Sequence, residues 1–140
     1  MAPGRIYNSS MLVVSKKVEY SVVLVRALAE TDEFASLAQV ARDKKLPYRY
    51  TTQLARILRE AGVVVSREGK AGGYQLVPEW KKKNLYDLLC ALGEKKSIVK
   101  CMALEGRCHR EVECQLKSVW QAVDRSVVEA MKKISIIEKK

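Results

Sequence analysis

Three cysteines, Cys101, Cys108 and Cys114, lie within fourteen residues of one another in the arrangement C-x6-C-x5-C. The residues between them are polar and include Gly106, so we expect a loop here rather than a rigid helix face. Thiolates are soft ligands that select iron–sulfur clusters, zinc or Cu(I). Zinc sites typically pair their cysteines more closely, so this wide spacing favours a cluster whose iron atoms sit apart. A redox disulfide and inert thiols are the two interpretations that need no metal.

The elements that would position these thiols belong to a small basic protein. The chain has 140 residues, a formal net charge of +10 and four cysteines. Such a charge favours an acidic partner, and double-stranded DNA is a better candidate than an anionic membrane. The alternative is a basic protein that has no acidic partner. No apolar run reaches the roughly 18 residues of a membrane span, and residues 11–14 are too few for a signal-peptide core. We therefore expect a cytoplasmic protein of one domain, with no membrane association, whose cysteines bind metal or react.

The first element is a predicted helix. Residues 1–10 are polar and unpatterned, and we expect a disordered tail. From Ser15, which suits the N-cap position, apolar residues recur at helical spacing until Thr31. The apolar stripe consists of Val18, Val22, Val25, Leu28 and Ala29.

Two short helices then form a predicted helix-turn-helix. The first begins at Ser36, a good N-cap, and ends by Pro47, because the residue before a proline is pushed out of the helical region. The second covers residues 48–61 and stops at Gly62, a suitable residue for a helix end. The residues expected to face the core are Leu37, Val40, Ala41, Leu54, Ile57, Leu58 and Ala61.

A β-hairpin is predicted to follow. The β-rich runs at residues 63–67 and 74–77 flank a glycine-containing turn, and Pro78 closes the hairpin. Added to the two short helices, the hairpin makes a winged helix-turn-helix. A fourth helix, residues 85–92, is expected to end at Gly93 and to carry Cys90 as a small buried residue near its apolar face.

The C-terminal region has a regular apolar stripe from Leu116 to Ile137, which predicts a helix of roughly 36 Å. A small domain can hardly cover so long a stripe, so we expect a homodimer with two-fold symmetry in which this helix packs on its copy. The alternative is a helix folded back on its own domain. The predicted fold class is mainly α (α+β): a winged helix-turn-helix domain at 11–93, a cysteine-containing cluster loop at 94–114 and a long dimerisation helix at 115–140.

Several markers occur together and in order along the chain. They are Ser15, Lys16, Tyr20, the run 37–41 (LAQVA), the helix at 50–58, the run 72–74 (GGY) and the three cysteines. From Met11 to the C-terminus this order resembles a family of bacterial winged helix-turn-helix regulators that includes the iron–sulfur regulator IscR and the nitric-oxide sensor NsrR. The resemblance implies a DNA-binding transcriptional repressor that senses redox state, nitric oxide or iron through a cysteine-ligated cluster.

The helix at residues 48–61 is the predicted recognition helix, with its N-terminal residues aimed at base edges in the major groove. By similarity to the family, the residues that contact DNA there are Arg49, Tyr50, Thr52 and Gln53. Arginine can form a forked pair with guanine, glutamine can pair with adenine, and threonine can contact the thymine methyl group.

Further cations and polar groups are expected to position the DNA. Arg56 and Arg59 can meet phosphates, and a solvated basic face is the alternative for these arginines. In the wing, Arg67 and Lys70 flank the glycine turn and suit the narrow, negative minor groove. Ser36 and Gln39, near the start of the second helix, are expected to contact the phosphate backbone.

A cluster usually needs four ligands, and the loop supplies three. The resemblance to IscR implies a histidine three residues after the last cysteine, but Lys117 stands there and cannot bind metal while protonated. His109, beside Cys108, is one candidate. The resemblance to NsrR implies an acidic residue from the partner subunit, which places Glu19 as a second candidate, with an ordinary surface carboxylate as its alternative. This favours a [4Fe–4S] over a [2Fe–2S] cluster.

Two other functions remain open at this point. The protein can be a regulator that works without metal, through thiol chemistry or a protein partner, or an iron–sulfur carrier that needs the thiols but no DNA reader. The sequence has one histidine and no paired-carboxylate or nucleophile motif, so we expect no enzymatic activity and no small-molecule substrate.

Overall fold

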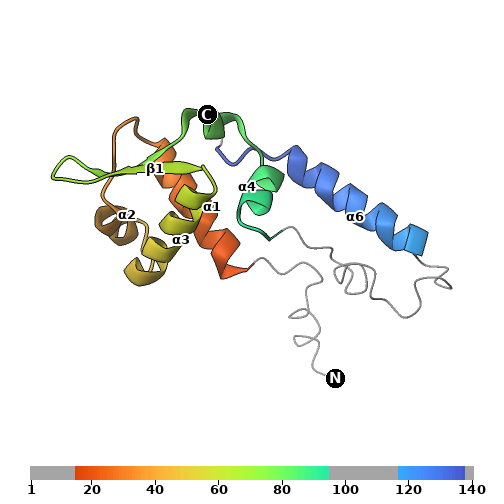
Figure 1. The fold of residues 1–140 in the computed structure, drawn as a ribbon. Helices are drawn as coiled ribbons and strands as arrows, with labels where there is room; N and C mark the ends of the chain where they lie inside the picture. Colours follow the sequence, from red (N-terminus) through yellow and green to blue (C-terminus); the bar gives the residue numbers. More distant parts are fainter. Residues whose placement is uncertain (1–14, 95–116, 138–140) are drawn as a thin grey trace, which may run out of the picture.

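The computed structural model describes residues 15–94 and 117–137. The predicted tail, Cys101, Cys108, Cys114 and His109 lie outside these residues. The described chain is mainly helical, with one antiparallel pair of strands (Figure 1). In chain order the elements are α1 (Lys16–Ala29), α2 (Leu37–Asp43), α3 (Tyr48–Glu60), β1 (Val64–Arg67), β2 (Gly73–Leu76), the 3₁₀ helix η2 (Pro78–Lys82), α4 (Leu85–Ala91) and α6 (Lys117–Lys132).

Ser15 starts α1 as predicted, because its hydroxyl oxygen accepts a hydrogen bond of 3.3 Å from the Val18 N–H. Such a bond satisfies one of the N–H groups that every helix start leaves unpaired. Leu24, Val25 and Leu28 turn one side of α1 into the core, where each is almost fully buried. α1 thereby forms the support on which α3 and β2 pack.

α2 and α3 form the predicted helix-turn-helix. The expected core residues of α2 are buried: Leu37, Val40 and Ala41. On α3, Leu54 and Leu58 are buried as predicted, but the prediction for Ala61 is wrong, since this residue is the C-cap and is exposed. Thr51 and Ala55 are buried instead, which leaves the opposite side of α3 facing outward.

The wing is the predicted hairpin, in which Arg67 of β1 pairs with Gly73 of β2. Tyr74 also exchanges two backbone hydrogen bonds with Ala35, of 2.8 and 2.9 Å, and so attaches the wing to the segment that leads into α2. Gly73 has a φ of +139°, and a Cβ there would lie 2.3 Å from the Ala35 carbonyl oxygen. Only glycine permits this close approach of two backbones.

The chain after the wing differs from the prediction. Pro78 begins η2 instead of only closing the hairpin. α4 then starts with a capping box, in which the side chains of Asn84 and Asp87 each accept a hydrogen bond from the other's backbone N–H. The prediction that Cys90 is buried is wrong, because this residue is exposed. It lies about 200° around the helix from Leu88, which fills the core.

The C-terminal helix is shorter than its apolar stripe predicts. α6 ends at Lys132 and does not continue to Ile137. The chain then turns back, and the Leu85 N–H donates a 2.8 Å hydrogen bond to the Ile134 carbonyl. Ile136 is only 4% exposed and belongs to the core. Ile136 and the partly buried Ile137 therefore complete the core of the winged unit, whereas Ile134 is exposed.

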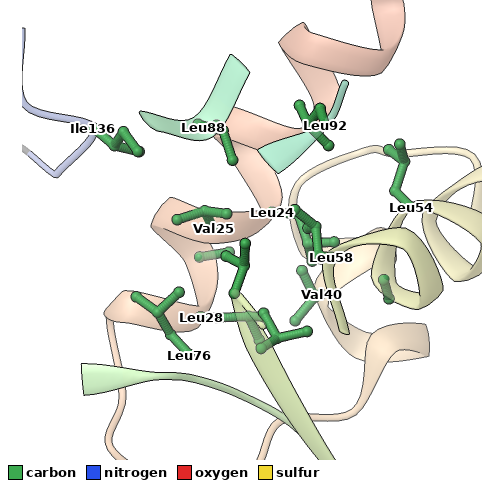
Figure 2. Close-up of a cluster of buried hydrophobic side chains, with 14 of the residues drawn as sticks. Leu24, Val25, Leu28, Val40, Leu54, Leu58, Leu76, Leu88, Leu92 and Ile136 are labelled. Atoms are coloured by element: carbon green, nitrogen blue, oxygen red, sulfur yellow. The ribbon is translucent and has the colours of Figure 1, made fainter. Parts of the chain in front are cut away.

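One apolar cluster joins these elements. Figure 2 shows side chains from α1, α2, α3, β2, α4 and the segment after α6 meeting in one place. The labelled residues are Leu24, Val25, Leu28, Val40, Leu54, Leu58, Leu76, Leu88, Leu92 and Ile136. Since burial of apolar surface is the main favourable contribution to folding, this cluster fixes the relative positions of α1, α3 and the wing.

Candidate DNA-binding surface

The outward side of α3 carries four of the side chains predicted to contact DNA. Arg49, Thr52, Gln53 and Arg56 are all exposed and follow one another at helical spacing, so they share one side of the helix. The opposite side is fixed in the core by Leu54 and its buried neighbours. This rigid presentation of an exposed polar row is what insertion into a major groove requires.

Local bonds restrain part of this outward side. The Thr52 hydroxyl donates to the Tyr48 carbonyl at 2.9 Å, so its methyl group and oxygen lone pairs remain for a ligand. Arg56 makes an ion pair of 3.5 Å with the glutamate four residues later, and exposure of both side chains makes that pair weak. Arg59 donates to the Ser66 hydroxyl at 3.3 Å, which turns it toward the wing.

Tyr50 has a packing role that the sequence did not indicate. Its half-buried ring lies edge-on to the ring of Tyr20 on α1, with 5.7 Å between centroids and 72° between planes. The predicted recognition helix is therefore joined to α1 through two aromatic rings as well as through the core.

In the wing, Arg67 is held by two contacts. The guanidinium carbon lies 4.3 Å from the centre of the Phe34 ring, and Nη2 donates to the Ala71 carbonyl at 3.1 Å. Lys70 is exposed in the turn beyond. Phe34 was not predicted to have a role. Its position could have indicated one, because it is the one phenylalanine of the chain and lies in a polar loop.

The start of α2 lies beside the wing in space. Ser36 precedes this helix and makes no capping hydrogen bond, and Gln39 is exposed one turn further on. Ala35, the residue before Ser36, is the one bonded to Tyr74 of β2. The predicted backbone contacts of α2 and of the wing thus come from two segments that are bonded together.

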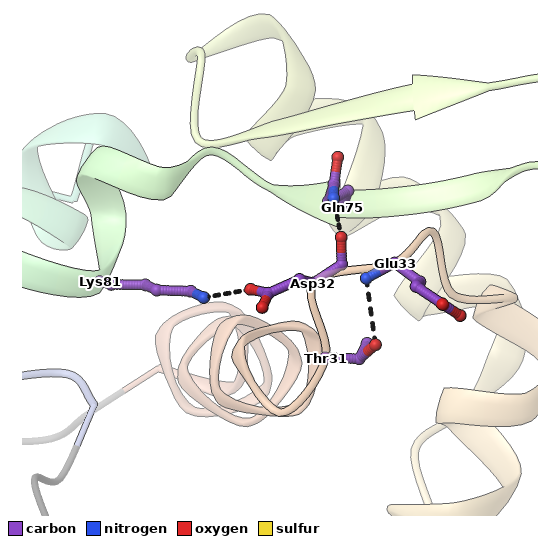
Figure 3. Close-up of polar contacts among 5 residues, drawn as sticks. All are labelled: Thr31, Asp32, Glu33, Gln75 and Lys81. Carbon is purple, nitrogen blue, oxygen red and sulfur yellow. Dashed lines mark hydrogen bonds and ion pairs between the residues drawn. The ribbon is translucent and has the colours of Figure 1, made fainter.

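A polar junction fixes the loop between α1 and α2 (Figure 3). Lys81 of η2 lies 2.5 Å from a carboxylate oxygen of Asp32, and the Gln75 side chain donates to the Asp32 carbonyl. Glu33 N–H donates to the Thr31 hydroxyl at 3.1 Å. The hydrogen bond from Lys81, with its charge, lowers the pKa of Asp32. The junction joins this loop to the base of the wing.

Glu19 is the one predicted cluster ligand that lies within the described residues. It is half-exposed on α1 and lies 3.2 Å from the Lys16 ammonium, and this hydrogen bond raises the pKa of Lys16. Lys16 also lies over the ring of Tyr20, 5.5 Å from its centre. Within residues 15–94 and 117–137 no three side chains come together to form a metal site.

Lys17 marks where the chain leaves the winged unit toward the cysteines. It donates to the Leu92 carbonyl at 2.8 Å and lies 3.6 Å from Glu94. Because consecutive helical residues are about 100° apart, Glu19 lies on the side of α1 away from this point. A carboxylate so placed is turned away from Glu94, the last described residue before the cysteines.

Comparison with known proteins identifies the family. Residues 14–138 match the sequence profile of the Rrf2 family, described as iron-dependent transcriptional regulators. The chain belongs to the Rrf2 family. It is 29% identical over 94 residues to protein rrf2 of Nitratidesulfovibrio vulgaris, covering 67% of this chain and 63% of that protein. It is 25% identical over 127 residues to the transcriptional regulator IscR of Vibrio vulnificus, covering 89% and 75%.

Solved Rrf2-family structures confirm the predicted winged-helix fold class. IscR of T. potens has 31% identity and a TM-score of 0.68, with 89% of this chain and 83% of that chain covered. CymR, the global cysteine regulator of B. subtilis, has 28% identity and the same TM-score, with 89% and 93% covered. These relatives are transcriptional regulators and not enzymes. Among the described helices none is long and apolar enough to cross a membrane.

Proposed function

We propose that this Rrf2-family chain is a cytoplasmic, homodimeric repressor that binds double-stranded DNA and responds to redox state, nitric oxide or iron through an iron–sulfur cluster. The observation that carries the DNA-binding part is the exposed row of Arg49, Thr52, Gln53 and Arg56 on α3. The net charge of +10 favours the same polyanionic partner.

The individual side chains suit distinct contacts. Arg49 and Gln53, one turn apart near the start of α3, can form bidentate pairs with guanine and adenine, each worth about 1–3 kcal/mol of discrimination. Arg56 and Arg59, further along α3, are assigned to phosphates. Tyr50, the other predicted contact on α3, lies against Tyr20, so we assign it to packing rather than to DNA. The last predicted contacts lie on the α2 and wing segments and are Ser36, Gln39, Arg67 and Lys70.

A second copy of the chain is the proposed partner of α6. Figure 1 shows α6 extending away from the winged unit beyond its contact with α4. A shallow apolar surface along this helix is lined by Val119, Ala122, Val123, Ser126, Val127 and Ala130. Pairing of two such surfaces would bury them and place two recognition helices for half-sites about 34 Å apart, one turn of DNA.

The cluster ligands we propose are the thiolates of Cys101, Cys108 and Cys114 with the carboxylate of Glu19 from the partner subunit. Three soft thiolates fit an iron–sulfur cluster. Glu19 is exposed, and its position on the side of α1 away from Glu94 favours ligation across the dimer over ligation within one chain. Since a protonated Lys117 cannot complete a histidine-type site, [4Fe–4S] is favoured over [2Fe–2S].

Such a cluster, when bound, supplies one-electron redox chemistry and reactivity toward nitric oxide. Contacts within the chain connect Glu19 to the proposed DNA-binding surface. Lys16 pairs with Glu19 and lies over Tyr20, and Tyr20 packs on Tyr50 of α3. If Glu19 changes its partner, Lys16 is released, and the Tyr20–Tyr50 pair can pass that rearrangement to the recognition helix.

The test is anaerobic purification of the full chain, followed by the visible spectrum and by iron and acid-labile sulfide per chain. We expect a brown protein with stoichiometric iron and sulfide, and an iron count that separates two-iron from four-iron clusters. DNA affinity is then measured before and after treatment with nitric oxide, oxidant or chelator. A brown protein whose DNA affinity never changes would contradict the sensing part alone.

A second candidate is a regulator without metal, controlled by thiol chemistry or a protein partner. The similarity to the cysteine regulator CymR, equal in TM-score to the similarity to IscR, favours it. A colourless protein that stays colourless after attempted cluster rebuilding, yet still binds DNA selectively, would support this candidate over the first.

A further inference from the structure

Three helices of the described chain end in the same way. After α2, α3 and α4 a residue with positive φ follows the C-cap, and the next N–H bonds back across the last turn. The positive-φ residue is Gly62 after α3 (φ +78°) and Gly93 after α4 (φ +70°), but Lys45 after α2 (φ +56°). The back bonds are Leu46 N–H to Ala41 O at 2.8 Å, Val63 N–H to Leu58 O at 2.9 Å and Glu94 N–H to Leu89 O at 2.9 Å.

The backbone at Lys45 is in a conformation that disfavours a side chain. In the left-handed region the Cβ of an L-residue crowds the following carbonyl oxygen, whereas glycine has no Cβ and adopts the region readily. At the two matching helix ends of this chain the residue is glycine. A residue held in a disfavoured backbone conformation, where glycine would serve the fold better, points to a function for its side chain.

The side chain of Lys45 is available for such a function. It is exposed and lies three residues before the first residue of α3. The neighbouring Lys44 is used within the fold, since its ammonium lies 2.8 Å from Glu30. In the part of the chain that the structure describes, no carboxylate pairs with Lys45. Its charge is therefore not committed to any described group.

We propose that Lys45 binds a DNA phosphate at the edge of the groove that α3 enters, an inference that rests on the proposed function. When a helix inserts its N-terminal end into the major groove, the residues just before that end meet the phosphates that line the groove. An ammonium is a point charge without a fixed fork, so the contact does not depend on the bases.

Three variants of the full chain test the proposal: Lys45→Gly, Lys45→Ala and, as a control with the same charge change, Lys82→Ala on η2. The probe is a labelled duplex of random sequence, about 30 base pairs long so that it is long enough for both subunits of a dimer to contact it one helical turn apart. Affinity is measured by anisotropy over a range of KCl concentrations, and Tm is measured for each variant.

Lys45→Gly should move stability and binding in opposite directions. We expect its Tm to rise by about 2 °C through relief of the left-handed strain. Its DNA affinity should fall about fivefold near 0.1 M salt, and the slope of log K against log salt should shrink by about 0.9. Lys45→Ala should lose the same affinity without the gain in Tm, and Lys82→Ala should bind like the wild type.

Any other result would contradict one part of the proposal. Wild-type affinity and salt slope in Lys45→Gly would overturn the phosphate contact, and a lower Tm would overturn the strain argument on which it depends. An equal loss in Lys82→Ala would reduce the effect to net charge and would also overturn the contact. A wild-type chain that binds no duplex would overturn the proposed function itself, which separates that failure from failure at Lys45.

Discussion

The rings of Tyr20 and Tyr50 join α1 directly to α3, the proposed recognition helix, edge to face, with 5.7 Å between centroids. Tyr20 follows Glu19, the proposed ligand, and Tyr50 follows Arg49, the proposed base reader. A displacement of α1 relative to α3 must therefore rearrange this ring pair, which places the pair between the two proposed functions of the protein.

Replacing Tyr50 separates packing from hydrogen bonding. Tyr50→Phe keeps the ring pair, so we expect wild-type stability and DNA affinity, whereas Tyr50→Ala should lose about 2 kcal/mol of unfolding free energy. Denaturant unfolding and duplex anisotropy measure the two quantities. A double-mutant cycle with Tyr20→Ala should give a coupling of about 0.5–1.5 kcal/mol. Lost DNA affinity in the stable Tyr50→Phe would instead make the hydroxyl a DNA contact.

Phe34 should order the wing through Arg67. Removal of the ring by Phe34→Ala eliminates a cation–π contact worth about 0.5–1 kcal/mol at an exposed site. We expect faster hydrogen exchange of the wing amides and weaker DNA binding, with no further loss when Arg67→Ala is added. Val65→Ala is the control, because Val65 is an exposed apolar residue on β1, the strand that carries Arg67. Full additivity of the two losses would show that Phe34 and Arg67 act separately.

The junction at Asp32 should respond to acid. Because Lys81 lowers the folded-state pKa of Asp32, the pair stabilises the fold above the unfolded pKa, and this stabilisation is lost as pH falls through the lowered folded value. Lys81→Met should raise the pKa of Asp32 back toward the ordinary value of an aspartate, as followed by NMR titration of its carboxyl carbon. Lys82→Met should leave it unchanged. An unshifted Asp32 titration in Lys81→Met would contradict the contact.

Arg49 should read a base. After selection of a preferred operator from a random pool, Arg49→Ala is expected to weaken binding to that operator by about 1–3 kcal/mol and to relax preference at one position. Binding to random duplex should change little. Arg125→Ala, an exposed arginine on α6, is the control. A loss of equal size on both duplexes would assign Arg49 to a phosphate.

The cysteines should divide into two groups. Cys101→Ala, Cys108→Ala and Cys114→Ala are each expected to remove the bound iron and sulfide and the response of DNA binding to nitric oxide or oxidant. Dimer mass and helical circular dichroism should not change. Cys90→Ala should behave like the wild type, because Cys90 is outside the proposed ligand set. Variants of the first group that still respond normally would exclude the thiols from sensing.

Local patterns predicted most of the fold because local physics determines it. Ser15 caps α1 through a bond to a residue three positions away, and Gly62 ends α3 through its own positive φ. Both signals can be read within a few residues of sequence. The exposed row on α3 was predictable for the same reason, since helical spacing alone decides which residues share a side.

Tertiary contacts determined those features of the fold that local sequence patterns could not predict. The apolar spacing of Ile134 and Ile137 continues the stripe of α6, yet the bond from Leu85 to Ile134 draws this segment back onto α4. Nothing near Arg67 in the sequence indicates its contact with Phe34, more than thirty residues earlier. The left-handed backbone conformation of Lys45 was not predicted either, because a lysine in the sequence does not indicate a positive φ.

The return of Ile136 to the core has a topological consequence. Leu92 is bonded to Lys17 just before the segment that carries the cysteines, and Ile134 is bonded to Leu85 just after α6, so both flanks of the intervening chain are anchored to a single core. Removing the chain after α4 would therefore also remove Ile136 from the hydrophobic interior. Under the proposed function, a signal received between these two attachments would act on the DNA-binding unit through both of them at once.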